Sequence, residues 1–347
     1  MKSLKLIFFI LVIFMKTGNN LSADNLFFVN NIEITKKTTN NIEFLANEAI
    51  KKGFRELLNK VLLKKDKNKL SSLEFIEIKD LVSYYQIIEG EDEDQNKIFF
   101  NISFDKDKLH TLFYRTGLKY SDISQNELYL LPIFKKNNQL NIYTNNYFYE
   151  NWNKKNKDTV VEFILPIENI EILQVLNINI ENLLNIKIEE IFSEYNNKNL
   201  ALIIIEENES KIEKIFLKTL IVGKEIDKSL KIDKKNLEQD QFYEKIILQT
   251  KEEIVNLVKS QNLIDIRTPS FMNVKLISSK KNNLVELSKR LKKIDLIENI
   301  FVQELNTDYV NLKIKYFGKI NKIIEQLKNE NIILELKGDQ WSVELIQ

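Results

Sequence analysis

The order of apolar periods in the C-terminal part of the chain constrains its fold more than any other sequence feature. Strand-like alternation and helix-like spacing follow one another at 272–278, 282–294, 298–305, 309–317, 320–330 and 332–337. A period near two indicates a strand, and a period near 3.6 indicates a helix. The series strand, helix, strand, strand, helix, strand is the split β-α-β pattern. It predicts an antiparallel sheet with both helices on one face, because crossover connections are right-handed.

One more strand follows this series. Gly338 and Asp339 interrupt the apolar alternation, which resumes at 340–346. Glycine at the first central position of a two-residue turn favours a type II′ hairpin. We therefore predict a ferredoxin-like domain over 270–347 with an extra C-terminal hairpin strand.

The remaining length suits two more modules. A chain of 347 residues with 44% hydrophobic residues can fill two or three compact cores, using about 100–200 residues per domain. A polar linker at 153–158 separates two parts of the chain that differ in their pattern of apolar residues. The predicted fold class is α+β, with three small α/β modules in series, at 24–152, 159–265 and 270–347.

The first module begins with a strand at 27–37 and a strongly amphipathic helix at 40–63. Asn40 and Glu43 have the spacing of a capping box. Asp105 is placed to cap a second helix, which Gly117 ends. The strand pair 131–134 and 139–144, joined across the KKNN turn, is expected to complete the sheet of this module.

The middle module contains the most apolar strand of the chain. The run NLALIIIEE at 199–207 is continuous, as in a strand that is buried on both faces of an α/β layer. A strand that ends at Pro166 precedes it, and a helix at about 239–261 closes the module. The chain has few glycines, and asparagine pairs, as at 137 and 145, are expected to replace glycine in loops.

The first 23 residues have the pattern of a secretory signal peptide. Lys2 and Lys5 precede an apolar stretch at 6–15, and Ala23 stands at the expected cleavage site. The apolar stretch is shorter than the roughly 20 residues that a membrane span requires. We expect a periplasmic protein with no stable membrane span after signal cleavage. The chain contains no cysteine, so neither a lipid anchor on cysteine nor a disulfide is expected.

Several kinds of chemistry lack the residues they need. The seven glycines are isolated, whereas a dinucleotide or phosphate loop needs several together. His110 is the single histidine, and we expect it to lie on the surface flank of a helix. We predict no catalytic residue, no cofactor and no metal ligand. The near balance of 51 basic and 50 acidic residues disfavours nucleic acid as a partner.

The acidic run at 89–94 offers a partial calcium motif. Asp92, Asp94 and Asn96 have the spacing of the first three ligands, but Lys97 stands where the loop needs glycine and Ser103 where it needs a bidentate glutamate. We interpret the run as a solvated hairpin tip. Dispersed acidic residues could still form a hydrolase site, because sequence does not give their separation in space.

The densest aromatic cluster lies at 143–152. Tyr147, Phe148 and Trp152 are the candidate interaction residues in it. An aromatic ring can bury about 150–250 Å², and a ligand platform is the alternative interpretation. We expect these three side chains to pack at a seam between the first and second modules.

Several of these segments resemble, in order, the bacterial exported family catalogued as domain of unknown function 2066. The similar segments are at 46–62, 83–89, 101–113, 128–134, 145–152 and 161–171, and the resemblance covers about 26–205. The positions that fit are Ala46, Ala49, Pro132, Trp152, Leu165 and Pro166. Tyr147 stands where the family usually has proline, and Glu168 where it has Gly-Asp. More loosely, the middle module is similar to the N-terminal part of the Tol-system protein TolB.

The resemblance implies export and no assigned activity, so no residue role carries over. Together with the missing motifs, it leads us to expect a non-enzymatic interaction or assembly module of the cell envelope, whose protein partners the sequence does not name. A binding protein for a small molecule or glycan is one alternative. A hydrolase with a dispersed acidic site is the other.

Overall fold

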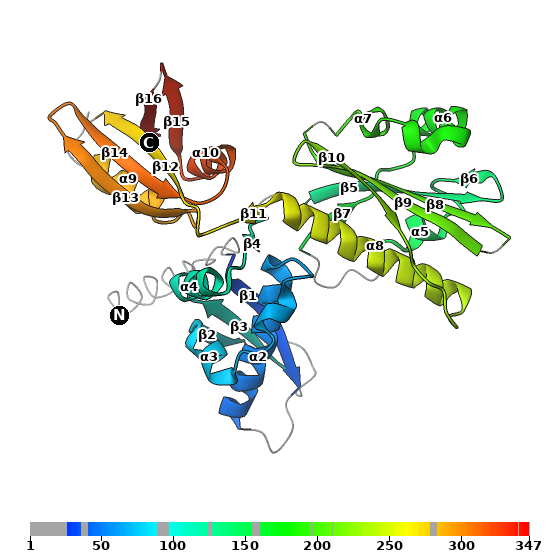
Figure 1. Cartoon of the computed structure of the whole chain (residues 1–347), viewed down its shortest axis with the longest axis horizontal. Coiled ribbons are helices and arrows are strands. Elements are labelled where there is room, and N and C mark those ends of the chain that lie inside the picture. The colour runs from blue at the N-terminus through cyan, green and yellow to red at the C-terminus, as the bar shows by residue number, and fades with distance from the viewer. Residues whose placement is uncertain are drawn as a thin grey trace, which may run out of the picture. The chain divides into compact units, whose positions relative to one another are not determined.

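The computed structural model describes residues 26–35, 41–88, 97–123, 127–154, 160–195, 197–209, 211–277, 283–338 and 340–346. The predicted signal peptide, the acidic run at 89–94 and most of the linker at 153–158 lie outside the described residues. Helices and strands alternate along the chain, which gives the predicted mixed α and β class (Figure 1). In the described part of the chain, every helix is too short or too polar to cross a membrane.

The chain forms two compact units. Unit 2 comprises Leu62–Lys65 and Ser121–Leu263, and unit 1 comprises the described residues of 1–61, 66–120 and 264–347. The chain leaves unit 1 after Tyr120 and returns to it at Ile264. The short strands β4 (Tyr120–Ser121) and β11 (Leu263–Ile264) pair at these two crossings. Unit 2 is therefore inserted into the sequence of unit 1.

The N-terminal part of unit 1 is a three-stranded antiparallel sheet with helices packed on it. Its elements are β1 (Phe28–Thr35), α2 (Ile42–Val61), η1 (Lys67–Leu70), α3 (Phe75–Asp80), β2 (Val82–Ile88), β3 (Lys97–Phe104) and α4 (Lys106–Thr116). The strand order is β1-β3-β2. A Cβ at Gly53 of α2 would lie 2.6 Å from Ile32 of β1, so glycine lets this helix approach the sheet closely.

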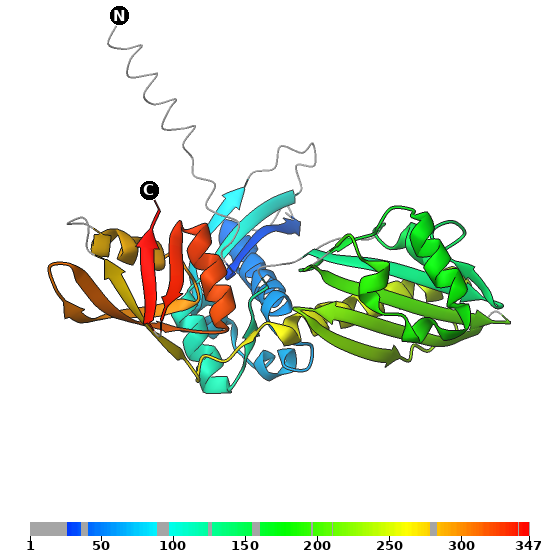
Figure 2. The same ribbon diagram turned by 90° about the horizontal axis from the view of Figure 1, so that it is seen from above.

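The C-terminal part of unit 1 follows the element order that the apolar periods predict. Its elements are β12 (Ser270–Ile277), α9 (Asn283–Leu291), β13 (Ile297–Leu305), β14 (Tyr309–Tyr316), α10 (Ile320–Asn329), β15 (Ile332–Lys337) and β16 (Gln340–Leu345). Leu287, Leu291, Ile323 and Leu327 are the buried positions of the two helices. Figure 2 shows α10 running beside β15.

The strand order of this sheet is β13-β14-β12-β16-β15. A split β-α-β sheet places its fourth strand directly beside its first. Here β16 pairs in parallel with β12 and antiparallel with β15, so the last strand lies between them. The ferredoxin-like arrangement itself stays a prediction.

Unit 2 is built on a six-stranded sheet with helices on both faces. Its elements are β5 (Glu127–Lys136), β6 (Gln139–Asn141), α5 (Tyr147–Asn151), β7 (Glu162–Ile164), α6 (Ile170–Ile178), η2 (Ile180–Asn185), α7 (Ile188–Ile191), β8 (Asn199–Asn208), β9 (Lys211–Ile221), β10 (Lys224–Leu230) and α8 (Gln239–Gln261). The order is β10-β9-β8-β5-β6, and β7 pairs with β5.

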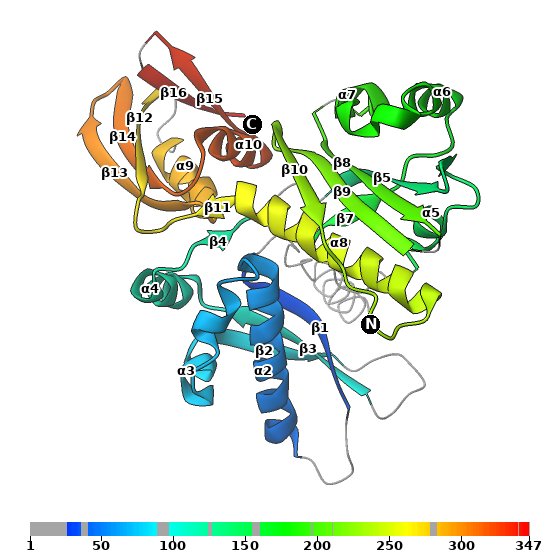
Figure 3. The same cartoon turned by 45° about the vertical axis from the view of Figure 1, so that its right-hand side comes forward.

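The central strands of unit 2 separate two cores. Ala201, Ile203 and Ile205 of β8 face the core that includes α8, and Leu202 and Ile204 face the core that includes α6 and α7. Figure 3 shows α8 along one face of the sheet, with α6 and α7 on the other. The prediction of a strand buried on both faces at 199–207 is confirmed.

The expected placement of the strand pair 131–134 and 139–144 is wrong. The pair exists as β5 and β6, but β5 pairs in parallel with β8, from Leu128 opposite Asn199 to Lys136 opposite Glu207. It therefore belongs to the sheet of unit 2 and not to that of the first module. Parallel pairing joins strands that are distant in sequence, and local alternation carries no information about the partner.

Candidate functional site

The aromatic residues singled out by sequence lie at α5 in unit 2. Asn146 caps this helix, because its Oδ1 accepts from the backbone nitrogens of Phe148 and Tyr149, at 3.1 and 3.3 Å. Phe148 and Trp152 are 0% exposed. Both belong to the core that α8 closes, and Tyr147 packs against it. The structure thus brings the three residues together inside unit 2, and their role in interaction stays a prediction.

Lys251 of α8 lies beside Trp152 in this core. It is 5% exposed, and its ammonium donates to the backbone oxygen of Trp152. It lies 5.6 Å from the ring centre of Trp152 and 5.5 Å from that of Phe163. Burial lowers the pKa of Lys251 to about 8. Enzymes use amines of this kind as nucleophiles, but here a carbonyl and two rings surround the ammonium, as around a structural cation.

A polar cluster lies where the parallel strands β5 and β8 end. The Glu207 side chain is 0% exposed, and its Oε1 lies 3.1 Å from Nζ of Lys136. Its Oε2 accepts from Nε2 of Gln239, at 3.0 Å, and from the hydroxyl of Tyr243. Burial, and then the hydrogen bond to Glu207, raise the pKa of Tyr243.

Open α/β sheets bind ligands at the carboxyl ends of their strands, so this cluster is a natural place to look for chemistry. Its carboxylate, however, is already engaged by an ammonium, an amide and a hydroxyl. A buried charge with such partners is typical of a structural network. Sequence reasoning missed the cluster, although a glutamate that ends a continuous apolar run was the available signal.

The single histidine belongs to an aromatic cluster in unit 1. Nε2 of His110 lies 3.1 Å from the hydroxyl of Tyr120, and the two rings stack at 5.5 Å. The edges of Phe27 and Phe317 pack against it at 5.8 and 5.6 Å. Burial, and then Lys106, lower the pKa of His110 to about 4. The expectation of a surface histidine is wrong, because this half-buried ring joins four segments of unit 1.

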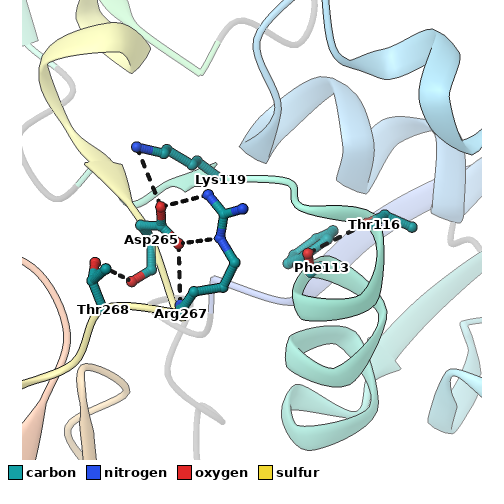
Figure 4. A network of polar contacts seen from close by, with 6 residues as sticks. All are labelled: Phe113, Thr116, Lys119, Asp265, Arg267 and Thr268. Atoms are coloured by element: carbon teal, nitrogen blue, oxygen red, sulfur yellow. Dashed lines mark hydrogen bonds and ion pairs between the residues drawn. The ribbon is translucent and has the colours of Figure 1, made fainter.

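An ion-pair network lies in unit 1 beside the crossings. Both carboxylate oxygens of Asp265 accept from Arg267, at 2.9 Å from Nε and 2.8 Å from Nη2. Nζ of Lys119 lies 3.3 Å from the same carboxylate. These bonds, Arg267 first, hold the pKa of Asp265 well below its usual range. In Figure 4 both cations point at Asp265, which therefore joins the segment after α4 to the segment before β12.

A shallow depression of about 380 Å³ lies between α9 and the C-terminal end of α10, and charged residues line it. Arg290 spans it, since Nη1 donates to the backbone oxygens of Glu330, Asn331 and Ile346. Lys293 lies 3.0 Å from the Glu330 carboxylate. The charged residues that line the depression therefore bind groups of the chain itself and hold α9 to the segment after α10. No group of three or more metal-binding side chains occurs among the described residues.

The strand β2 differs from these polar clusters, because it is an edge strand with partly exposed apolar side chains. It forms one edge of the N-terminal sheet. Tyr84, Tyr85, Ile87 and Ile88 are 39%, 44%, 41% and 38% exposed, respectively. Tyr85 and Ile87 lie opposite Ile102 and Phe100 of β3, so they extend the face that α2 covers, while Tyr84 and Ile88 extend the other face.

The other sheet edges carry charges, which discourage pairing with further strands. Of the described edge strands longer than three residues, β1 contains Glu33, β10 contains Asp227, β13 contains Glu304 and β15 contains Lys337. The sequence of β2, VSYYQII, has no charged residue. An apolar, uncharged edge is the geometry by which proteins add a strand from a partner. We therefore take β2 as the candidate interaction site.

Comparisons with protein-family models, curated proteins and solved structures give no significant match to this chain.

Proposed function

We propose that this protein is an exported, non-enzymatic interaction or assembly module of the cell envelope, and that β2 is its docking strand. The observation that carries the proposal is the uncharged edge strand with four half-exposed aromatic and aliphatic side chains. Main-chain hydrogen bonds would supply affinity along such an edge, and the side chains on the two faces would supply selectivity.

The engagement of the polar clusters supports a binding role over a catalytic one. The carboxylates of Glu207 and Asp265 and the amine of Lys251 each contact groups of the chain itself. Catalytic groups instead converge on a space that a substrate can enter. Export rests on the signal pattern at 1–23. The ferredoxin-like arrangement and the family resemblance belong to the same proposal.

Site-specific photo-crosslinking in cells tests the docking strand. A photoreactive phenylalanine analogue replaces Tyr85 on β2 or, as the control, Tyr114 on α4, which is 63% exposed. We expect a discrete crosslinked species from position 85 and none from position 114. The absence of any discrete species from position 85, in cells that produce the protein at its normal level, would overturn the proposed function. The same fractions report whether the protein is periplasmic and begins after Ala23.

A further inference from the structure

We propose that the partner of β2 is a second copy of this chain, which adds its own β2 antiparallel to the first about a two-fold axis through Gln86. The inference rests on the proposed function, since it uses the same strand, and it names the occupant. It would join two three-stranded sheets into one continuous sheet with strand order β1-β3-β2-β2-β3-β1.

The register follows from the regular part of β2. The pairing of β2 with β3 shifts between Val82 and Tyr84 and is regular from Tyr84 to Ile88. An isologous contact requires that if one residue faces a second, the second also faces the first. With the axis at Gln86, Tyr84 lies opposite Ile88 of the other copy, and Tyr85 lies opposite Ile87.

This register makes the segment YYQII complementary to itself. On each face of the new sheet, every tyrosine meets an isoleucine, and pairs of aromatic and β-branched side chains are among the favourable cross-strand pairs. The two Gln86 side chains meet at the axis, where each amide has both a donor and an acceptor to offer. Neither face of the segment leaves an apolar residue opposite a charge.

Charge also favours a second copy as the occupant. A two-fold axis places a residue on the axis opposite its own copy, so a charge there would meet a like charge and destabilise the pair. No residue of β2 is charged. The longer edge strands β1, β10, β13 and β15 each contain a charged side chain, so an axis through that residue would place two like charges opposite each other.

The contact is small. Stable dimers bury roughly 800 Å² on each partner, and a single added strand with four side chains already more than half covered provides less. We therefore expect a reversible dimer with a dissociation constant in the micromolar range, visible in concentrated solution or where the protein is locally enriched.

Sedimentation of the chain without residues 1–23, over about 1–500 μM, tests the inference at the concentrations where a weak contact appears. We expect a monomer–dimer equilibrium in the wild type. Gln86→Lys and Gln86→Glu should each weaken it by at least tenfold, because each places two like charges on the axis. An equimolar mixture of the two variants should restore association, as the axis then holds opposite charges. Tyr114→Lys, a new charge on the exposed face of α4, should leave association unchanged.

Gln86 is exposed, so these variants should fold, and the mixture confirms that each remains competent to associate. A wild type that stays monomeric throughout, or association that Gln86→Lys leaves intact, would overturn the inference. In either case, a crosslinked species of a mass other than twice that of the chain would keep β2 as a docking strand for another protein. The absence of every crosslinked species would overturn the proposed function as well.

Discussion

At the scale of single residues, burial sets the proton affinity of Lys251. Its pKa of about 8, against an ordinary value of 10.5, means that folding disfavours the charged amine. A group whose pKa falls on folding costs stability in full below the folded pKa, and that cost is relieved as the pH rises toward the unfolded pKa. The window for Lys251 is therefore pH 8 to 10.5.

We predict that the free energy of unfolding rises through this window by on the order of 1–3 kcal/mol more in the wild type than in Lys251→Met. Urea unfolding at a series of pH values measures the difference. All other titratable groups are the same in the two proteins, so their contributions cancel. Equal slopes in the two proteins would show that Lys251 is solvated in the folded chain.

The contacts of polar side chains were the least predictable feature of the sequence. Glu207, Tyr243 and Lys136 come from three elements, and nothing in local periodicity says that they meet. His110 has the spacing of a helix flank, but its neighbours Phe27 and Phe317 come from distant segments. The prediction that asparagine replaces glycine in loops is confirmed for two of the pairs, since Asn137 and Asn145 both have positive φ. That prediction depended on backbone sterics alone.

At the scale of elements, the residue that caps the N-terminus of α5 also holds the neighbouring hairpin. Asn146 is 0% exposed, and besides capping the helix its Nδ2 donates to the backbone oxygens of Pro132, Asn141 and Ile142, at 2.8, 3.0 and 2.8 Å. One side chain thus fixes α5 to the β5–β6 hairpin. Losing it would leave buried donors and acceptors without partners, which costs more than losing a solvated cap.

We predict that Asn146→Ala destabilises unit 2 by about 2–4 kcal/mol. Asn169→Ala is the matched control, because Asn169 caps α6 with the same geometry, is less buried and should cost about 1 kcal/mol. Asn146→Asp keeps the acceptor but removes the donors, so it should resemble the alanine variant. Denaturant unfolding compares the three, and equal losses at positions 146 and 169 would contradict the role of the buried amide.

Elements were predicted well wherever periodicity was strong. The helix expected at 239–261 is α8 (Gln239–Gln261), and the helix between Asp105 and Gly117 has both predicted caps. The strand order of the C-terminal sheet was not predictable in the same way. Whether the last hairpin strand lies outside the sheet or between β12 and β15 depends on cross-strand packing, and both positions need the same alternation.

At the scale of the whole molecule, the chain is not a simple series. Residues 121–152 belong to the first module expected from sequence, but β5 (Glu127–Lys136) pairs with β8 in the sheet of unit 2. Insertion of one unit into another is tolerated where the two crossings lie close together, and the pairing of β4 with β11 provides that proximity. Without a structure, domain boundaries are expected at polar linkers, such as the one at 153–158. That linker falls within unit 2.

Two fragments of the chain test whether unit 2 is an inserted domain or whether the chain is divided into modules in series. We predict that residues 121–263 fold on their own and unfold cooperatively in urea, because they retain the sheet from β5 to β10 and both of its cores. They lose the Leu62 backbone oxygen, which accepts from Lys259, so some stability is lost. Residues 24–152, which end at the boundary expected from sequence, should not fold cooperatively, since β5 then lacks β8.

Trp152 reports on both fragments, because the other tryptophan, Trp341, lies outside them. In residues 121–263 its indole keeps Phe163 and the Lys251 side chain as neighbours, so its emission should be blue-shifted and should move red in one urea transition. In residues 24–152 both neighbours are absent, and the emission should match that of the unfolded chain. A cooperative transition in residues 24–152, with none in 121–263, would instead favour the modules in series.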